Sequence, residues 1–189
     1  MLYFSDLERK GLIMKKLFLF LLLALPLLAE NLHLKEGFVA AHTEMMMDST
    51  IDPLSNVLTA QMSIQNDDIT TMKGTISVEM DFFSSDNSDR DEHMDEATET
   101  AKFPLATYTV EEVSKAKDEG SYTLKGTLDF HGQKKALAFN SEIIKQADSI
   151  VINATSTFLM SDYGIEPPCM MFLCVRDSID LFAKAVLIK

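Results

Sequence analysis

Alternating apolar and polar residues along most of the chain predict β-strands with one buried face. Between residues 73 and 84 apolar side chains take every second position, and the alternation returns at 123–130 and 150–160. Because successive side chains of a strand point to opposite faces, each segment presents one apolar face to a core. The predicted inward positions are Ile76, Val78, Met80 and Phe82, then Leu124, Gly126, Leu128 and Phe130, then Ile150, Ile152, Ala154, Ser156, Phe158 and Met160.

The C-terminal segment, residues 179–189, differs from these strands because it is apolar on both faces. One face carries Ile179, Leu181, Ala183, Ala185 and Leu187, and the other carries Phe182, Val186 and Ile188. A strand of this kind is typical of a closing barrel strand that another element covers. It is equally consistent with the seam of a homodimer.

Short polar turns separate the predicted strands, which favours antiparallel neighbours. These turns lie at residues 52–53, 66–68, 118–120 and 132–134. One short helix is expected at 89–99, with Ser88 or Asp89 as its N-cap and acidic residues in its first turn. Many strands with a single helix are consistent with a sandwich or a barrel. Since closure removes the exposed edges of long strands, we expect an all-β fold, an antiparallel β-barrel.

The N-terminal segment, residues 1–29, is predicted to be a cleavable export signal. Lys15 and Lys16 precede a run of 12 apolar residues that ends before Ala29. A membrane-spanning helix needs about 20 apolar residues, so this run is too short to span. Met14 is an alternative start of the protein. Residues 30–189 then form a single domain, exported to the periplasm and not inserted in the membrane after cleavage.

The charge of this domain excludes several classes of partner. Residues 30–189 contain 13 basic and 27 acidic residues, which leaves a net charge of −14. A surface of this sign repels phosphate backbones and anionic lipid headgroups. Nucleic acid is therefore not an expected partner.

Residue patterns that carry catalysis or bind metals do not occur in the sequence. The histidines, His33, His42, His93 and His131, are not spaced as metal ligands. No phosphate-binding glycine loop and no nucleophile motif is present. We therefore expect no catalytic residue, no metal and no cofactor.

Cys169 and Cys174 are the two cysteines of the chain. On an extended strand their Cα atoms would lie about 16 Å apart, at about 3.3 Å per residue. A disulfide tolerates about 7 Å, so a bridge requires a tight loop between them. Two free buried thiols are the favoured interpretation, with a disulfide as the alternative.

Four short motifs resemble those of the YceI-like proteins. They are Asn-x-x-Arg-Asp-x-His at 87–93, Phe-Pro at 103–104, Leu-x-x-His-Gly-x-x-Lys at 128–135 and Ser-Asp-Tyr-Gly at 161–164. With the strand pattern they extend the resemblance from about residue 56 to the C-terminus. The chain departs from the family pattern at Met160 and Ala136, where the family has a basic residue and a proline.

The resemblance implies a lipocalin-like barrel of about eight strands, with an apolar tunnel that holds a polyisoprenoid, an isoprenoid quinone or a quinone precursor. Alternating inward side chains would form the tunnel wall. The expected wall residues are Ile76, Val78, Met80, Phe82, Leu128, Phe130, Ile152 and Phe158. The protein would then be a periplasmic carrier of a long apolar lipid.

The motif residues are expected to be structural. Arg90 would pair with Asp162 or Asp91, and His93 and His131 would hydrogen-bond backbone groups at loop junctions. The full motif set is Asn87, Arg90, Asp91, His93, His131, Gly132, Asp162, Tyr163 and Gly164.

Two other functions stay open at this point. One is a stress-related structural protein with a filled barrel, which would release no ligand. The other is an accessory factor in isoprenoid quinone metabolism, for which His93 is the candidate acid or base.

Overall fold

Eight long antiparallel strands form most of the molecule in the computed structural model, which describes residues 29–45, 49–170 and 173–189. The predicted export segment, apart from Ala29, lies outside these residues. The eight strands are β1 (Ala29–Met45), β4 (Leu58–Gln65), β5 (Asp68–Glu79), β6 (Leu105–Lys115), β7 (Ser121–Phe130), β8 (Gln133–Lys145), β9 (Ser149–Leu159) and β12 (Ser178–Ile188).

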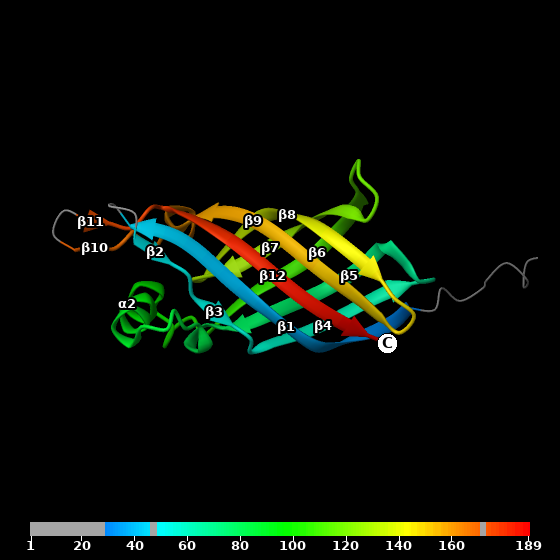
Figure 1. The fold of residues 1–189 in the computed structure, drawn as a ribbon, viewed down its shortest axis with the longest axis horizontal. Coiled ribbons are helices and arrows are strands. Elements are labelled where there is room, and N and C mark those ends of the chain that lie inside the picture. The colour runs from blue at the N-terminus through cyan, green and yellow to red at the C-terminus, as the bar shows by residue number, and fades with distance from the viewer. Residues whose placement is uncertain (1–28, 46–48, 171–172) are drawn as a thin grey trace, which may run out of the picture.

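These strands close into a barrel. Their order is β12-β9-β8-β7-β6-β5-β4-β1, and β1 pairs in turn with β12 (Figure 1). Every pairing in this circuit is antiparallel, because short turns join most consecutive strands. The predicted all-β antiparallel barrel of about eight strands is confirmed.

The first strand changes partners along its length. β1 pairs with β4 over residues 29–32 only, and further along with β3 (Leu54–Ser55) and β2 (Ser49–Ile51). The segment that carries β2 and β3 therefore completes the barrel wall beside the second half of β1.

The single α-helix of the described residues, α2 (Ser88–Thr98), lies at one end of the barrel (Figure 1). The predicted helix is confirmed, but its predicted cap is wrong. Asn87 is the N-cap, because its side-chain oxygen accepts a hydrogen bond from the Arg90 amide at 3.0 Å. The helix ends at Thr98, and its C-cap, Glu99, has a left-handed conformation.

The other short elements lie near the same end. They are the 3-10 helices η1 (Met80–Phe82) and η2 (Met160–Tyr163), and a separate hairpin of β10 (Cys169–Met170) and β11 (Leu173–Cys174). No helix in the described part of the chain is long and apolar enough to cross a membrane.

The hairpin of β10 and β11 joins Cys169 and Cys174 in a disulfide. The prediction of two free thiols is wrong, because it assumed a single extended strand. The chain reverses between the two cysteines, which pair directly across the hairpin with their Cα atoms 4.0 Å apart.

The last strand, β12, closes the barrel between β9 and β1. Its outer face is only partly covered within one chain: Val186 is 8% exposed, whereas Phe182 is 41% exposed and packs beside Phe38 with the ring centroids 5.7 Å apart. A homodimer that covers this face stays a prediction.

The half of the barrel away from α2 is filled by side chains. Its most deeply buried members are Leu32, Ile64, Met72, Ile150 and Leu187, none more than 2% exposed. At that end Lys189 forms an ion pair with Glu30 at 3.1 Å, and Lys145 pairs with Asp67. Close packing there leaves the α2 half as the part of the interior that can hold a ligand.

An apolar cavity as the candidate functional site

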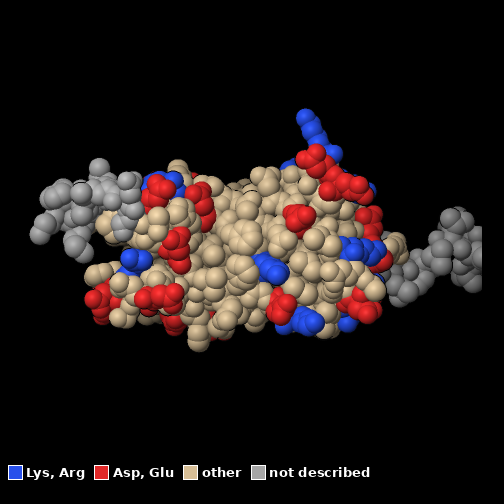
Figure 2. Space-filling view, in the orientation of Figure 1, with Lys and Arg blue, Asp and Glu red and all other residues tan. Residues whose placement is uncertain are grey.

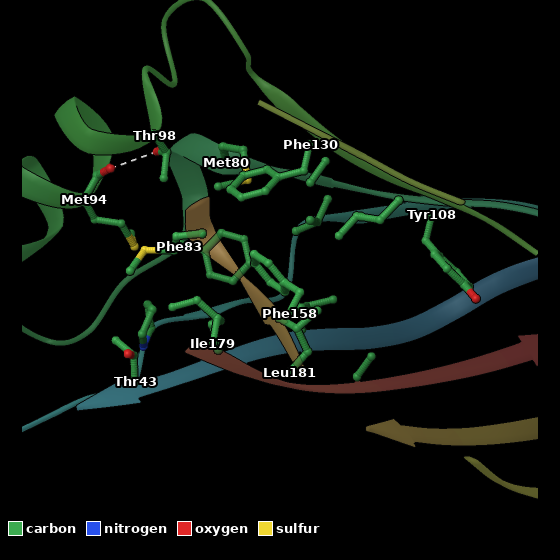
Figure 3. Close-up of a pocket in the computed structure, with 18 of the residues that line it drawn as sticks. Thr43, Met80, Phe83, Met94, Thr98, Tyr108, Phe130, Phe158, Ile179 and Leu181 are labelled. Carbon is green, nitrogen blue, oxygen red and sulfur yellow. Dashed lines mark hydrogen bonds between the residues drawn. The ribbon is translucent and has the colours of Figure 1, made fainter. Parts of the chain in front are cut away.

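A cavity of about 220 Å³ occupies the barrel half beside α2 (Figure 3). Side chains of β1, β5, β6, β7, β8, β9, β12 and α2 line it, and none of the described lining residues is charged. Figure 3 shows Met94 and Thr98 of α2 at one end of the cavity and Tyr108 of β6 at the other. Because side chains fill the opposite barrel half, a ligand would enter from the α2 end.

The two threonines of the wall make their hydrogen bonds with the backbone. Thr98 Oγ1 donates to the carbonyl oxygen of Met94 at 2.8 Å, within α2. Thr43 Oγ1 lies 3.2 and 3.1 Å from the carbonyl oxygens of Arg176 and Ser178. Their hydroxyl protons are therefore engaged within the protein, and their methyl groups are left for the cavity.

The third hydroxyl of the wall belongs to Tyr108. It lies 3.1 Å from the carbonyl oxygen of Leu124 and 2.9 Å from that of Leu137, so its proton is also engaged. Burial, together with the negative charge of Glu111, raises the pKa of the Tyr108 hydroxyl. The wall is therefore uncharged at neutral pH, and it offers an apolar ligand contact area but no ionic partner.

Six of the eight expected wall residues line this cavity: Ile76, Val78, Met80, Leu128, Phe130 and Phe158. Ile152 is inward but lies in the filled half, where it is 4% exposed. Phe82 is 53% exposed, because β5 ends at Glu79 and the turn of η1 breaks the alternation that placed Phe82 inside. Contact of these side chains with a ligand stays a prediction.

Other parts of the wall carried no clear sequence pattern. Val39 and Thr43 come from β1, whose inward residues are small and mixed in polarity, and Met94 is an isolated apolar residue on a charged helix. Phe139 of β8, in contrast, could have been predicted from the sequence. Leu137, Phe139, Ser141 and Ile143 alternate with the exposed residues between them. Only the tertiary structure brings α2 over the barrel end.

A family model for the YceI-like domain matches residues 30–187. The chain belongs to the YceI-like family. A comparison of the sequence with curated proteins finds no match.

Three solved structures share the fold of this YceI-like chain. BcnA from Burkholderia cenocepacia is 12% identical, with a TM-score of 0.70 over 79% of this chain and 95% of that chain. A polyisoprenoid binding domain from Saccharophagus degradans, implicated in plant cell wall breakdown, is 14% identical, with a TM-score of 0.64 over 84% and 97%. The Campylobacter jejuni YCEI protein is 17% identical, with a TM-score of 0.65 over 76% and 88%.

The first YceI-like motif organises the chain that enters α2. Beyond the cap at Asn87, the Asp91 carboxylate accepts hydrogen bonds from the Ser85 amide at 2.8 Å, the Ser85 hydroxyl at 2.6 Å and the Ser84 hydroxyl at 2.8 Å. Partial burial alone would raise the pKa of the Asp91 carboxyl, but these hydrogen bonds outweigh it and lower the pKa. The contacts hold α2 at the barrel end.

The His-Gly motif ties three segments together at the same end. His131 Nδ1 donates to the carbonyl oxygen of Tyr163 at 2.9 Å, and Nε2 lies 3.1 Å from a carboxylate oxygen of Glu99, just after α2. The Phe103 ring packs against the His131 ring with centroids 4.6 Å apart. Gly132 has a φ of 71°, and an added Cβ would lie 2.7 Å from the Phe103 ring. The hydrogen bond from His131 to the Tyr163 carbonyl oxygen is the backbone contact expected of this histidine.

Three other motif residues do not make the contacts expected of them. Among the described residues, no carboxylate lies within 4 Å of the Arg90 guanidinium, so the expected pair with Asp162 or Asp91 is absent. His93 and Asp162 have exposed side chains, and no described backbone group bonds His93. The His93 side chain faces solvent because α2 contacts the barrel through its other side, at Met94 and Thr98. Asp162 belongs to the turn of η2, where its side chain is exposed.

The last motif forms the turn at η2. Tyr163 is 1% exposed and packs against Phe130 and Phe158, with ring centroids 5.5 and 5.2 Å away. Burial raises its pKa to about 12. Gly164 has a φ of 76° and ends the turn. The turn thus supports two aromatic side chains of the cavity wall.

Proposed function

We propose that this protein binds an isoprenoid lipid, such as an isoprenoid quinone or its precursor, in the barrel cavity and carries it unchanged in the periplasm. The observation behind this proposal is a wall without charge whose hydroxyl groups are all engaged by backbone carbonyls. Membership of the YceI-like family supports it, and so does the similarity to a polyisoprenoid binding domain.

The energetics of the wall favour a hydrocarbon ligand. Moving apolar groups out of water is worth about 0.8 kcal/mol for each CH₂, without any polar contact. A hydrogen-bond acceptor placed in the same space would find no free donor on the described wall, and an unpaired buried polar group costs about 1–3 kcal/mol. The cavity therefore selects for the apolar part of a lipid.

Binding without catalysis is the second part of the proposal. The one titratable side chain on the described wall is Tyr108, and its raised pKa and two carbonyl neighbours oppose proton transfer at neutral pH. His93, the candidate acid or base of an accessory factor, has an exposed side chain and is absent from the lining residues. We infer that nothing on the described wall would act as acid or base.

Native mass spectrometry of the protein purified from its own host tests the binding proposal. Release by organic extraction of one isoprenoid per chain is the expected result. A ligand-free mass that persists after incubation with geraniol, farnesol and ubiquinone would contradict it and favour the structural alternative. Cys169→Ala with Cys174→Ala provides a matched control, because the disulfide hairpin forms its own small sheet and should not change the bound ligand.

Export to the periplasm requires a separate test, because the predicted signal lies outside the described residues. Cell fractionation of a C-terminally tagged chain, with N-terminal sequencing, should find periplasmic protein that begins at Glu30. A version that starts at Met14 should be exported equally well. Retention of an uncleaved chain in the cytoplasm would contradict the proposed compartment.

A further inference from the structure

The cavity wall ends at a common level on seven strands of the barrel. The deepest wall residues are Val39, Ile76, Tyr108, Leu124, Phe139, Ala154 and Ala183. Leu124 pairs across the strands with Phe139, and Ala154 pairs with Ala183, so these residues are neighbours around the barrel. The next inward residues, such as Val110 and Ile152, are each 4% exposed and belong to the filled half.

Two aromatic rings form the floor at this level. Tyr108 and Phe139 meet edge to face, with ring centroids 4.8 Å apart and an angle of 67° between the ring planes. The Tyr108 hydroxyl is held by the carbonyl oxygens of Leu124 on β7 and Leu137 on β8. Hydrogen bonding at one end and ring packing along its side fix the tyrosine, so the floor is not easily displaced.

The volume above this floor is small. An apolar cavity of about 150 Å³ holds one benzene, a molecule with six carbon atoms. On the same scale the cavity of about 220 Å³ holds about nine carbon atoms, because carbon content rises with volume at protein packing density. That is the size of about two isoprene units, far less than a long polyprenyl chain.

We propose that the cavity is a blind-ended pocket that measures chain length, enclosing an apolar chain of about ten carbon atoms between α2 and the floor of Tyr108 and Phe139. The inference rests on the proposed lipid-binding function and deepens it, since it states how much of an isoprenoid chain contributes to binding. Carbon atoms beyond this length remain at the α2 end, outside the apolar wall, and add nothing to binding.

A homologous series of prenyl alcohols tests this length limit. The series runs from prenol through geraniol and farnesol to geranylgeraniol, and the dissociation constant of each is measured by titration calorimetry. Affinity should rise about fourfold for each carbon atom that enters the cavity. It should stop rising between geraniol and farnesol. A continued increase through geranylgeraniol would show that the floor opens, and would overturn the length limit.

Truncating the floor should move this limit. Phe139→Ala removes a ring from the floor and should allow affinity to rise further, through farnesol. Phe139→Leu makes a smaller opening, in case the alanine variant does not fold, and should improve farnesol binding relative to geraniol. Ile143→Ala is the matched control, because Ile143 is a buried residue of the same strand that does not line the cavity. An unchanged limit in both Phe139 variants would contradict the assignment of the floor.

The outcomes separate the two proposals. If no prenyl alcohol binds, the lipid-binding function fails, and the length limit fails with it. If long prenyl alcohols bind better than geraniol, the lipid-binding function stands and only the length limit is wrong. If binding levels off near ten carbon atoms and the Phe139 variants extend it, both are supported.

Discussion

Single residues at the α2 end hold loops in conformations that other side chains would strain. Gly132→Ala should lower the free energy of unfolding by about 2–4 kcal/mol, since it combines a left-handed backbone with overpacking against the Phe103 ring. Gly120→Ala is the matched control: its φ of 78° is similar, but an added Cβ meets nothing within 4 Å. Urea denaturation should show a larger loss for Gly132→Ala, and equal losses would contradict the role of the Phe103 contact.

A second residue-scale prediction concerns pH. His42 Nδ1 lies 2.5 Å from Asp52 Oδ1, and this hydrogen bond raises the pKa of His42 and lowers that of Asp52. The stabilisation from His42 is complete below its ordinary pKa of 6.5 and is lost as pH rises through its raised value. The stabilisation from Asp52 is complete above 3.8 and is lost as pH falls through its lowered value.

The pair should therefore be most stabilising between about pH 4 and 6.5, because both partners are charged there. Thermal unfolding measured from pH 3 to 9 should show this maximum, and His42→Gln should flatten it. Both side chains are more than a third exposed, so the expected effect is small. An identical pH profile for the variant would show that the pair contributes nothing.

At the residue scale, the alternation of apolar and polar residues predicted the inward positions within a strand. The prediction failed where the strand ended before the alternation did. Ile76 and Val78 belong to β5, and their alternation was visible in the sequence. Phe82 continued the same alternation, yet η1 turns the chain before it. Alternation reports which side a residue would take if the strand continued, and it does not report where the strand ends.

At the scale of elements, α2 should depend on its N-cap. Asn87→Ala should lower the free energy of unfolding by about 1 kcal/mol, because the Arg90 amide loses its acceptor. Asn87→Asp keeps an oxygen at the same place and is the matched control. Faster hydrogen exchange of the first α2 amides is expected in the alanine variant alone. Equal exchange in both variants would contradict the capping role.

The disulfide hairpin is a second element with a clear test. Thiol titration of the denatured protein should find no free thiol before reduction and two afterwards. Because the hairpin is a sheet separate from the barrel, reduction should destabilise the hairpin by about 2 kcal/mol, the loop entropy of a short ring, and leave the barrel folded. Two free thiols in the unreduced exported protein would contradict this pairing.

At the scale of the whole molecule, charge should select the ligand's head group. The α2 helix carries five carboxylates and one arginine, and Figure 2 shows acidic residues gathered toward both ends of the barrel, around a largely uncharged middle. Burial raises the pKa of Asp95, and the negative charges of Asp81 and Asp91 raise it further, in agreement with a negative potential there. A ligand with an anionic head group at the α2 end would be repelled.

Geraniol should therefore bind more tightly than geranyl phosphate, by about tenfold at most. This difference in affinity should shrink as salt increases from 20 to 500 mM, because salt screens the repulsion. Both ligands share one chain, so a competition assay isolates the head group. Asp89→Asn with Glu92→Gln, which reduces the α2 charge without touching the described wall, should narrow the difference. Equal affinities at low salt would contradict the charge effect.

The sequence by itself determined the strands β5, β7, β9 and β12, the place of α2 along the chain and the apolar character of the interior, because each depends on local periodicity and on residues close together in the chain. Only the tertiary structure decided how much of the barrel is filled, since that depends on the summed volume of side chains that eight strands bring to each level. For the same reason, the Tyr108–Phe139 floor and the Cys169–Cys174 pair became visible only once the chain had folded back on itself.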